Sequence, residues 1–163
     1  MIMAGNDKAK SAIGGVFREV RFAFGEMFGG GKLDAKQELL VQVLFGLLGA
    51  LARSDGVVSA EEANFTNGLM DELSLNTRAR QLASEAFDRG CKRQLDLDTE
   101  IMRFLSVYQR GSAEVDRLYE SLLRLAAADA RIRPGERVFL EKVTLGLGYE
   151  PGELDTRLKR IMH

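Results

Sequence analysis

The chain has 163 residues, of which 45% are apolar and 29% are charged, and its formal net charge is -1. This composition excludes intrinsic disorder and lacks the basic excess of a nucleic-acid-binding protein, so we expect no nucleic-acid partner. One domain of this length buries about 70% of the surface of its unfolded chain. The single cysteine, Cys91, excludes an internal disulfide and a thiolate metal cluster within the chain, and it fits a reducing compartment such as the cytoplasm.

Helix-forming residues dominate the sequence from end to end. The chain has only two prolines, and its long runs of Ala, Leu, Glu and Arg favour helix almost everywhere. We therefore expect an all-α fold, a single-domain bundle of about seven to eight helices. After the N-terminal region, the predicted helices cover residues 35–52, 60–74, 77–89, 96–108 (with Asp96 or Asp98 as the start), 113–129, 134–147 and 152–162. The first of these is apolar nearly all round and is the predicted central helix, and Gly90 is the predicted left-handed end of the helix over 77–89.

Residues 10–28 have the periodicity of an amphipathic helix. Apolar side chains recur every three or four positions, while Arg18, Arg21 and Glu26 fall elsewhere on the helical wheel. The glycines at 29–31 then break the helix. We divide the chain into residues 1–32, an amphipathic helix with a glycine-rich linker, and residues 33–163, the helical domain. The predicted interaction residues form one apolar stripe, which consists of Ile13, Phe17, Val20, Phe24 and Phe28.

This apolar stripe has three possible destinations: the helical body, a second copy of the chain or a membrane surface. Covering the body or pairing fits better, because the polar face of the helix mixes arginine with glutamate. Peripheral contact of residues 10–28 with the inner face of the cytoplasmic membrane stays open as an alternative. We expect no stretch of the chain to be long and uncharged enough to span a bilayer, and we therefore expect a cytoplasmic protein.

An acidic segment occurs twice. Residues 55–62 and residues 129–136 both read Asp-x-x-aliphatic-x-x-x-Glu, and the apolar residues around them match at the same offset. A helix, a tight turn and a second helix therefore appear twice, which predicts an internal pseudo-two-fold repeat of helix-turn-helix units. The four acidic residues are the candidate site, an acidic turn cluster made of Asp55, Glu62, Asp129 and Glu136.

Two interpretations of the acidic turns stay open. Residues 55–62 match the second half of an EF-hand loop, but Leu51 and Arg53 stand where that loop has its early carboxylate ligands. A structural role explains the same residues, with each Asp accepting backbone N–H bonds in the turn and each Glu closing a capping box. A divalent cation shared between the two turns is the alternative, and Arg131 and Arg133 beside the second turn weaken it.

The residue types exclude the common catalytic pairs. The only histidine is His163, so Ser–His and Cys–His pairs have no base within the folded body. Cys91 is followed by Lys92 and Arg93, which favour a thiolate, but it has no partner residue. We expect no catalytic residues, no enzymatic activity and no cofactor other than a divalent cation at the acidic turns.

Short motifs in a fixed order carry a resemblance to a known family. They are Gln37-Glu38-Leu39-Leu40, Gly49 to Leu51, Leu69-Met70-Asp71, Ala86-Phe87 before Gly90, Met102-Arg103-Phe104 with Ser106-Val107, and Ala128-Asp129 with Pro134 and Glu136. Together with the two acidic turns that join paired helices, they make roughly residues 35–162 resemble the TerB-like domain family, which is named for tellurite resistance protein B.

Within this family the resemblance is to the region between the membrane anchor and the J domain of membrane-anchored DnaJ-type co-chaperones. It implies a non-enzymatic interaction or oligomerisation module with protein partners, self-association included. The chain departs from that pattern, because residues 10–28 are charged where those proteins have a spanning helix, and the His-Pro-Asp tripeptide of a J domain does not occur. The alternative is a free-standing tellurite-resistance or stress-response protein that binds a divalent cation through its acidic turns.

Overall fold

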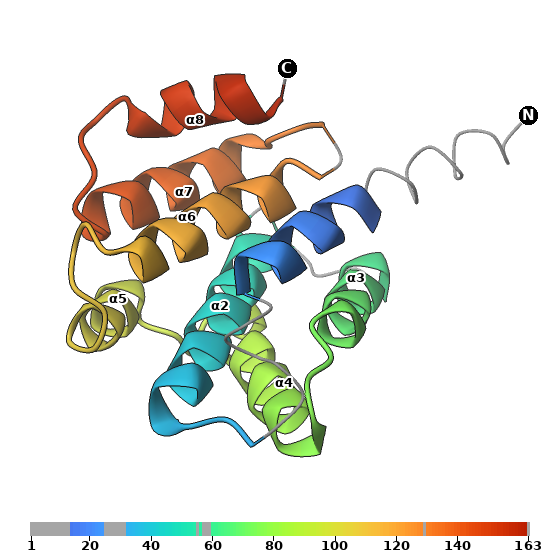
Figure 1. Ribbon diagram of the computed structural model, residues 1–163. Helices are drawn as coiled ribbons and strands as arrows, with labels where there is room; N and C mark the ends of the chain where they lie inside the picture. The colour runs from blue at the N-terminus through green and yellow to red at the C-terminus, as the bar shows by residue number, and fades with distance from the viewer. Residues whose placement is uncertain (1–13, 25–31, 55, 57–59, 129, 163) are drawn as a thin grey trace, which may run out of the picture.

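The computed structural model describes residues 14–24, 32–54, 56, 60–128 and 130–162. Every regular element in these ranges is a helix, which confirms the all-α prediction (Figure 1). An N-terminal helix over residues 14–24 comes first. The helices that follow are α2 (Ala35–Arg53), α3 (Ala60–Glu72), α4 (Thr77–Cys91), α5 (Leu97–Leu105), α6 (Ala113–Ala126), α7 (Pro134–Gly146) and α8 (Glu153–Ile161).

Several helices begin where short polar side chains cap them. The Asp34 carboxylate accepts a hydrogen bond from the Gln37 N–H at 2.8 Å, and the Asp34 N–H donates to the Gln37 side chain at 2.8 Å. Asn76 caps α4 by accepting from the Ala79 N–H at 2.8 Å. These bonds satisfy backbone N–H groups that have no partner within the helix. Both caps confirm the predicted starts of α2 and α4.

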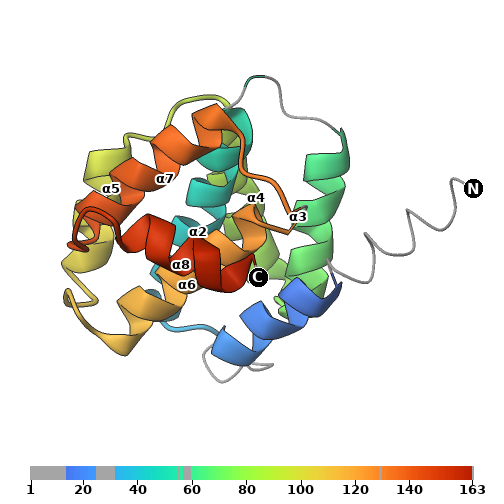
Figure 2. The ribbon, with the colours of Figure 1, turned by 90° about the horizontal axis from the view of Figure 1, so that it is seen from above.

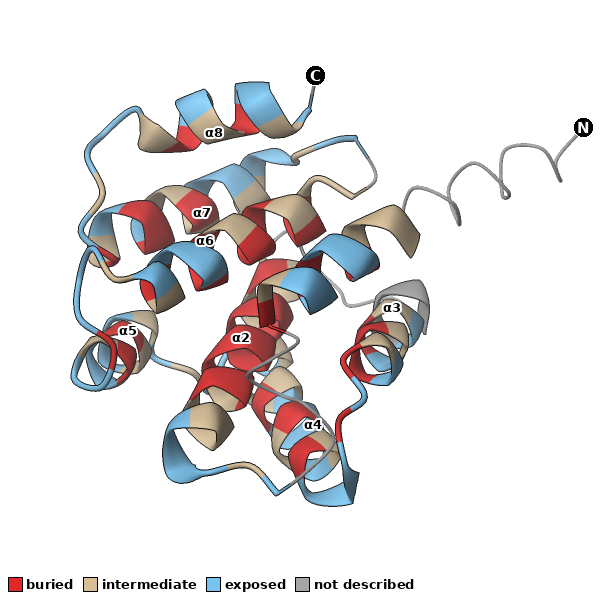
Figure 3. Ribbon diagram, viewed as in Figure 1, coloured by how far each residue is buried: buried red, intermediate tan, exposed pale blue. Residues whose placement is uncertain are grey.

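Helix α2 is the central element of the domain. Ten of its residues are buried, and α4, α5, α6 and α7 all pack against it (Figure 3). By length and composition, α2 is also the one helix of the described chain that is long and apolar enough to cross a membrane, with 56% of that stretch buried inside the structure. The expectation that no stretch meets this test is therefore wrong. The predicted central burial of the helix is confirmed.

Glycines allow α2 and α4 to pack with their backbones almost touching. A Cβ atom added at Gly90 would lie 2.6 Å from the Ala50 nitrogen and would also meet the Gly46 carbonyl oxygen. The predicted role of Gly90 as a left-handed helix end is wrong, because α4 continues to Cys91 and the positive φ of 58° belongs to Arg93. Gly90 instead removes the side chain that would separate the two helices.

The N-terminal helix lies between α3 and α6 (Figures 1 and 2). Phe17, Val20 and Phe24 are buried and belong to the same core cluster as α2 and α6. Ile13 and Phe28, the other two members of the predicted stripe, lie outside the described residues. The described part of the stripe therefore covers the helical body, while the domain boundary at residue 32 stays a prediction.

The chain repeats one order of helices. α2 is followed by α3 as α6 is followed by α7, and the two helices of each pair are separated by one of the two acidic segments, with α4 and α5 between the pairs (Figure 1). α7 begins with Pro134 at its first position, as predicted, and Gly148 with a φ of 97° follows its end. α5 and α6 end three residues earlier than predicted, at Leu105 and Ala126.

Candidate functional site

The structure describes one of the four acidic candidates in full. Asp55 and Asp129 lie outside the described residues, as does the side chain of Glu62. Glu136 lies in the first turn of α7, where its carboxylate accepts a hydrogen bond from the Arg133 N–H at 3.1 Å. This is the bond expected of a capping glutamate. Within the described ranges, no group of three or more His, Cys, Asp or Glu side chains is placed to hold a metal ion.

A cation shared between the acidic turns stays an open alternative that titration can test. Because the Glu136 carboxylate already accepts a backbone N–H, we expect calorimetric titration with calcium, magnesium, manganese or zinc to give no binding tighter than about 1 mM. Heat of binding that is present in the native chain and absent in the matched variant Glu136→Gln would show that this carboxylate is a ligand after all.

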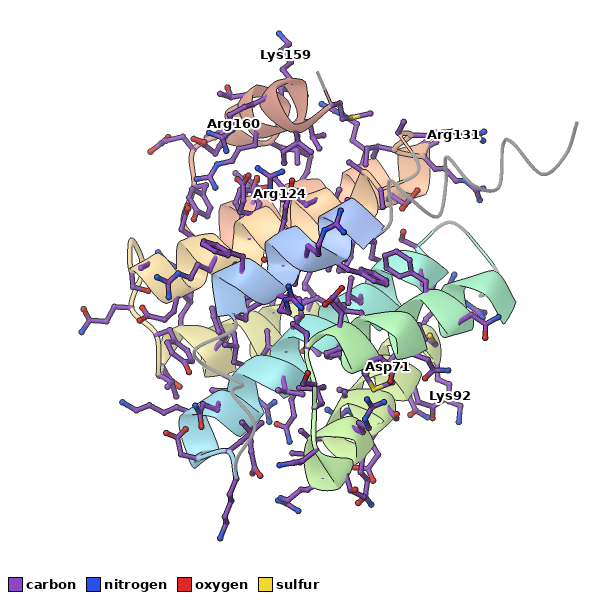
Figure 4. All side chains as sticks on the ribbon, turned by 45° about the vertical axis from the view of Figure 1, so that its right-hand side comes forward. Asp71, Lys92, Arg124, Arg131, Lys159 and Arg160 are labelled. Carbon is purple, nitrogen blue, oxygen red and sulfur yellow. The ribbon has the colours of Figure 1, made fainter. Side chains whose placement is uncertain are left out.

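The N-terminal helix makes an aromatic contact through its inner face and ionic contacts through its two exposed flanks. The Phe17 ring lies 5.0 Å from the Phe65 ring of α3, centroid to centroid, and packs over Gly68. Glu19 accepts a hydrogen bond from Arg124 of α6 at 2.6 Å, and Arg124 is labelled in Figure 4. Arg21 lies 3.0 Å from the Glu72 carboxylate of α3. We call the surface that receives the helix the receiving face, defined by Phe65, Gly68 and Glu72 of α3 and Arg124 of α6.

The outer face of the N-terminal helix carries an unusual side chain. Phe22 is 92% exposed, although the rings of Phe17 and Phe24 on the same helix are buried. Other large apolar side chains that are exposed lie elsewhere, on or just after α5 (Met102 and Val107), on α7 (Val138 and Leu145) and after α8 (Met162). The sequence pattern left Phe22 out of the apolar stripe but did not identify it as a surface residue, because Phe22 is one of several phenylalanines in a short apolar segment.

An arginine-centred cluster joins α6 and α8 and was not predicted from the sequence. The Arg157 side chain is 11% exposed and binds three carboxylates, those of Asp116 at 2.6 Å, Glu120 at 3.1 Å and Glu153 at 3.1 Å. Its guanidinium also lies about 5 Å from two aromatic ring centroids. We call these residues the Arg157 cluster, and its aromatic members are Tyr119 and Tyr149, stacked 4.5 Å apart.

Electrostatics within the Arg157 cluster favour the fully paired state. Burial alone would lower the pKa of Arg157, but its bonds to Asp116 and Glu153 outweigh burial and raise it. For Asp116, burial raises the pKa, and the hydrogen bonds from Arg157 and Tyr149 outweigh this and lower it. Burial and the Asp116 carboxylate, which accepts the Tyr149 hydroxyl at 2.8 Å, raise the pKa of Tyr149. The cluster is a structural clamp on α8, with its charges satisfied by one another.

We predict that Arg157→Ala destabilises the domain by about 2 kcal/mol, because it leaves carboxylates gathered around an empty position and removes the stacked guanidinium. The matched control is Arg160→Ala, since Arg160 contacts Glu120 at 2.8 Å but is 62% exposed. Its loss is expected to cost less than about 0.5 kcal/mol. Urea denaturation of both variants measures the difference, and equal losses would contradict the assigned role of the cluster.

These features define a class of protein: an all-helical domain of repeated helix-turn-helix units, in each of which the second helix begins after an acidic segment. The chain belongs to the family described as tellurite resistance protein TerB, whose model matches residues 41–158. The family membership predicted from the sequence is thereby confirmed.

The curated relatives carry a more particular name. The chain is 30% identical to co-chaperone protein DjlA of Vibrio vulnificus over 134 residues, which are 81% of this chain and 46% of that protein. It is 28% identical to co-chaperone protein DjlA of Shewanella oneidensis over 130 residues, 80% of this chain and 50% of that protein. For co-chaperone protein DjlA of Aliivibrio fischeri, the identity is 27% over 154 residues, 94% of this chain and 52% of that protein.

The chain therefore spans about half the length of the curated relatives it matches. No solved structure matches it significantly. The family match and the matches to DjlA co-chaperones together identify this chain as a DjlA-like TerB region.

Proposed function

We propose that this chain is a non-enzymatic interaction and oligomerisation module of a DjlA-like co-chaperone. The observation that carries the proposal is the extent of the match, because co-chaperones align with 80% or more of this chain in several species. The described helices are held together by an apolar core and by paired charges. A module of this kind works by holding partners in place, which requires a rigid body and an exposed contact surface.

Phe22 is the residue that we propose as a contact point for a protein partner. A ring that is 92% exposed contributes nothing to the core of this domain, whereas aromatic side chains are enriched at protein interfaces. It lies on the outer face of the N-terminal helix, away from the buried Phe17 and Phe24. The interaction residues of this helix are then divided, with the stripe serving the fold and Phe22 serving the partner.

Peripheral membrane contact through residues 10–28 stays a prediction, with one refinement. Because Phe17, Val20 and Phe24 are buried, the stripe is not presented to a lipid surface while the helix is seated. Membrane contact would have to use the exposed face that carries Arg18 and Phe22. Anionic lipid would attract that arginine, and the ring would enter the interface.

A chimera tests the proposed function. In it, the segment of the Shewanella oneidensis co-chaperone that matches this chain is replaced by this chain, and the chimera is produced in a Shewanella strain that lacks the native gene. We expect the chimera to rescue the defect that loss of the native gene causes in that strain. A chimera that carries Phe22→Ser should rescue the defect less. The matched control is a chimera that carries Val138→Ser, because this substitution also removes an exposed apolar side chain.

A second chimera provides the baseline for this test. It carries an unrelated helical domain of equal length at the same place. If the chimera with this chain restores no more than that baseline, although it is produced at the level of the native protein, the chain is not a module of a DjlA-like co-chaperone. Equal rescue by the Phe22→Ser and Val138→Ser versions would remove Phe22 from the contact surface and leave the module itself supported.

A further inference from the structure

The arginine of the receiving face, Arg124, is also paired within the helical body. Arg124 lies 3.2 Å from Glu120 on α6, and Glu120 is in turn bound by Arg157 and Arg160 of α8. The Arg124 guanidinium therefore bridges Glu120 and Glu19, which lies 2.6 Å away on the N-terminal helix. On α3, Phe65, Gly68 and Glu72 follow one another at spacings of three and four, so they share one helical face.

The N-terminal helix matches this face in shape and in charge. Phe17 packs against Phe65 and Gly68, and Val20 and Phe24 are fully buried. Two oppositely oriented ion pairs, Glu19 with Arg124 and Arg21 with Glu72, flank the apolar stripe on its two sides. Reversal of the helix direction would bring like charges together, so the charges of the face favour one orientation of its occupant.

We propose that the receiving face also binds the N-terminal helix of a second copy of this chain, so that two copies exchange helices and form a two-fold symmetric dimer. An identical helix has, by construction, every contact that the structure records within one chain, and it is the occupant for which the fit is known. This inference rests on the proposed function, because it supplies the route by which the module oligomerises.

The sequence of the connection is compatible with exchange. Eight peptide units join Phe24 to Lys32, and an extended chain of that length spans at most about 27 Å. It contains Gly29, Gly30 and Gly31, and glycine is the residue type with the fewest backbone restrictions. Exchange of an element between identical chains needs no new interface, since each contact is only transferred from one copy to the other.

Paired charge reversals test exchange directly. The helix variant carries Glu19→Arg with Arg21→Glu, and the face variant carries Arg124→Glu with Glu72→Arg. Within either variant the helix opposes its own face. In a mixture, exchange restores complementary charges at both seats, because the altered helix meets the altered face and the native helix meets the native face. A chain that carries all four substitutions is complementary by itself and is the control.

The two variants, one of them labelled with nitrogen-15, are unfolded together in urea, refolded together and examined by native mass spectrometry. Circular dichroism first establishes that each variant is helical. We expect a labelled–unlabelled dimer of twice the 18.0 kDa chain mass, at a fraction about ten-fold above the dimer of either variant alone. The control with all four substitutions is expected to form the same fraction of dimer as the native chain.

A mixture that contains only monomers, or one whose mixed dimer is no more abundant than the dimers of the separate variants, would overturn the exchange. Such a result leaves the rescue by the Shewanella chimera unaffected, because the chimera retains the native helix and face. Failure of exchange and failure of the proposed function are therefore separate outcomes.

Discussion

Gly90→Ala is expected to destabilise the domain by about 3 kcal/mol or more, because the added methyl group would collide with backbone rather than with a movable side chain. The atoms in its way are the Gly46 carbonyl oxygen and the Ala50 nitrogen, both on α2. Helices α2 and α4 would have to separate, and α2 is the element against which much of the core packs. Urea denaturation monitored by circular dichroism measures the loss.

Gly15→Ala is the matched control for this prediction. Gly15 also lies within a helix, but a Cβ atom added there meets nothing within 4 Å. Alanine is the better helix former, so this variant is expected to gain about 0.5–1 kcal/mol if the N-terminal helix unfolds with the domain. If Gly90→Ala were as stable as the native chain, the close approach of α2 and α4 would be wrong.

Phe24→Ala is expected to cost about 3–5 kcal/mol, as the truncation of a fully buried aromatic side chain does in other proteins. Phe24 is 0% exposed, and its ring is among the largest that the core encloses. The cavity would lie beneath the N-terminal helix, in the layer between this helix and the rest of the core. Thermal and urea denaturation of the full chain give the loss.

Phe22→Ala on the same helix separates burial from helix propensity. Phe22 is 92% exposed, so its truncation is expected to change the free energy of unfolding by less than about 0.5 kcal/mol. The two variants remove the same ring two positions apart. Equal effects on stability would mean that the N-terminal helix does not bury one face against the body, and the receiving face would then have no basis.

Local signals in the sequence predicted much of the fold. The caps by Asp34 and Asn76 depend on residues three positions apart, so the sequence alone contains both partners of each bond. The all-round apolar character of the helix over 35–52 predicted its central burial, which α2 has. Likewise, a proline at the first turn of α7 is a local signal, and it marks the start correctly.

Features that depend on distant residues were beyond the sequence pattern. In the sequence, Gly90 has the position of a helix-ending glycine. Only the close approach of α2 explains why a glycine stands inside α4 at this position. The Arg157 cluster draws Asp116 and Tyr149 from other elements, and its one local signal is the spacing of Glu153 and Arg157. Periodicity predicted the apolar stripe of the N-terminal helix, but the surface that the stripe meets is formed by α3 and α6.

The acidic turns illustrate the same division. Sequence repetition identified them and left two interpretations open. For Glu136, the bond from the Arg133 N–H is the one that a capping role requires. Asp55, Glu62 and Asp129 stay candidates on sequence grounds, and the cation titration decides between the interpretations for the whole cluster.

The seating of the N-terminal helix on the receiving face is the central structural claim, because both the presentation of Phe22 and the exchange of helices depend on it. Hydrogen–deuterium exchange of the full chain tests it most directly. The account predicts that amides of residues 18–24 are protected to within about ten-fold of those in the core of α2, since both would open with the whole domain. If the amide hydrogens of residues 18–24 were replaced by deuterium at the rate of an unfolded peptide while those of α2 stayed protected, the seating of the N-terminal helix would be contradicted.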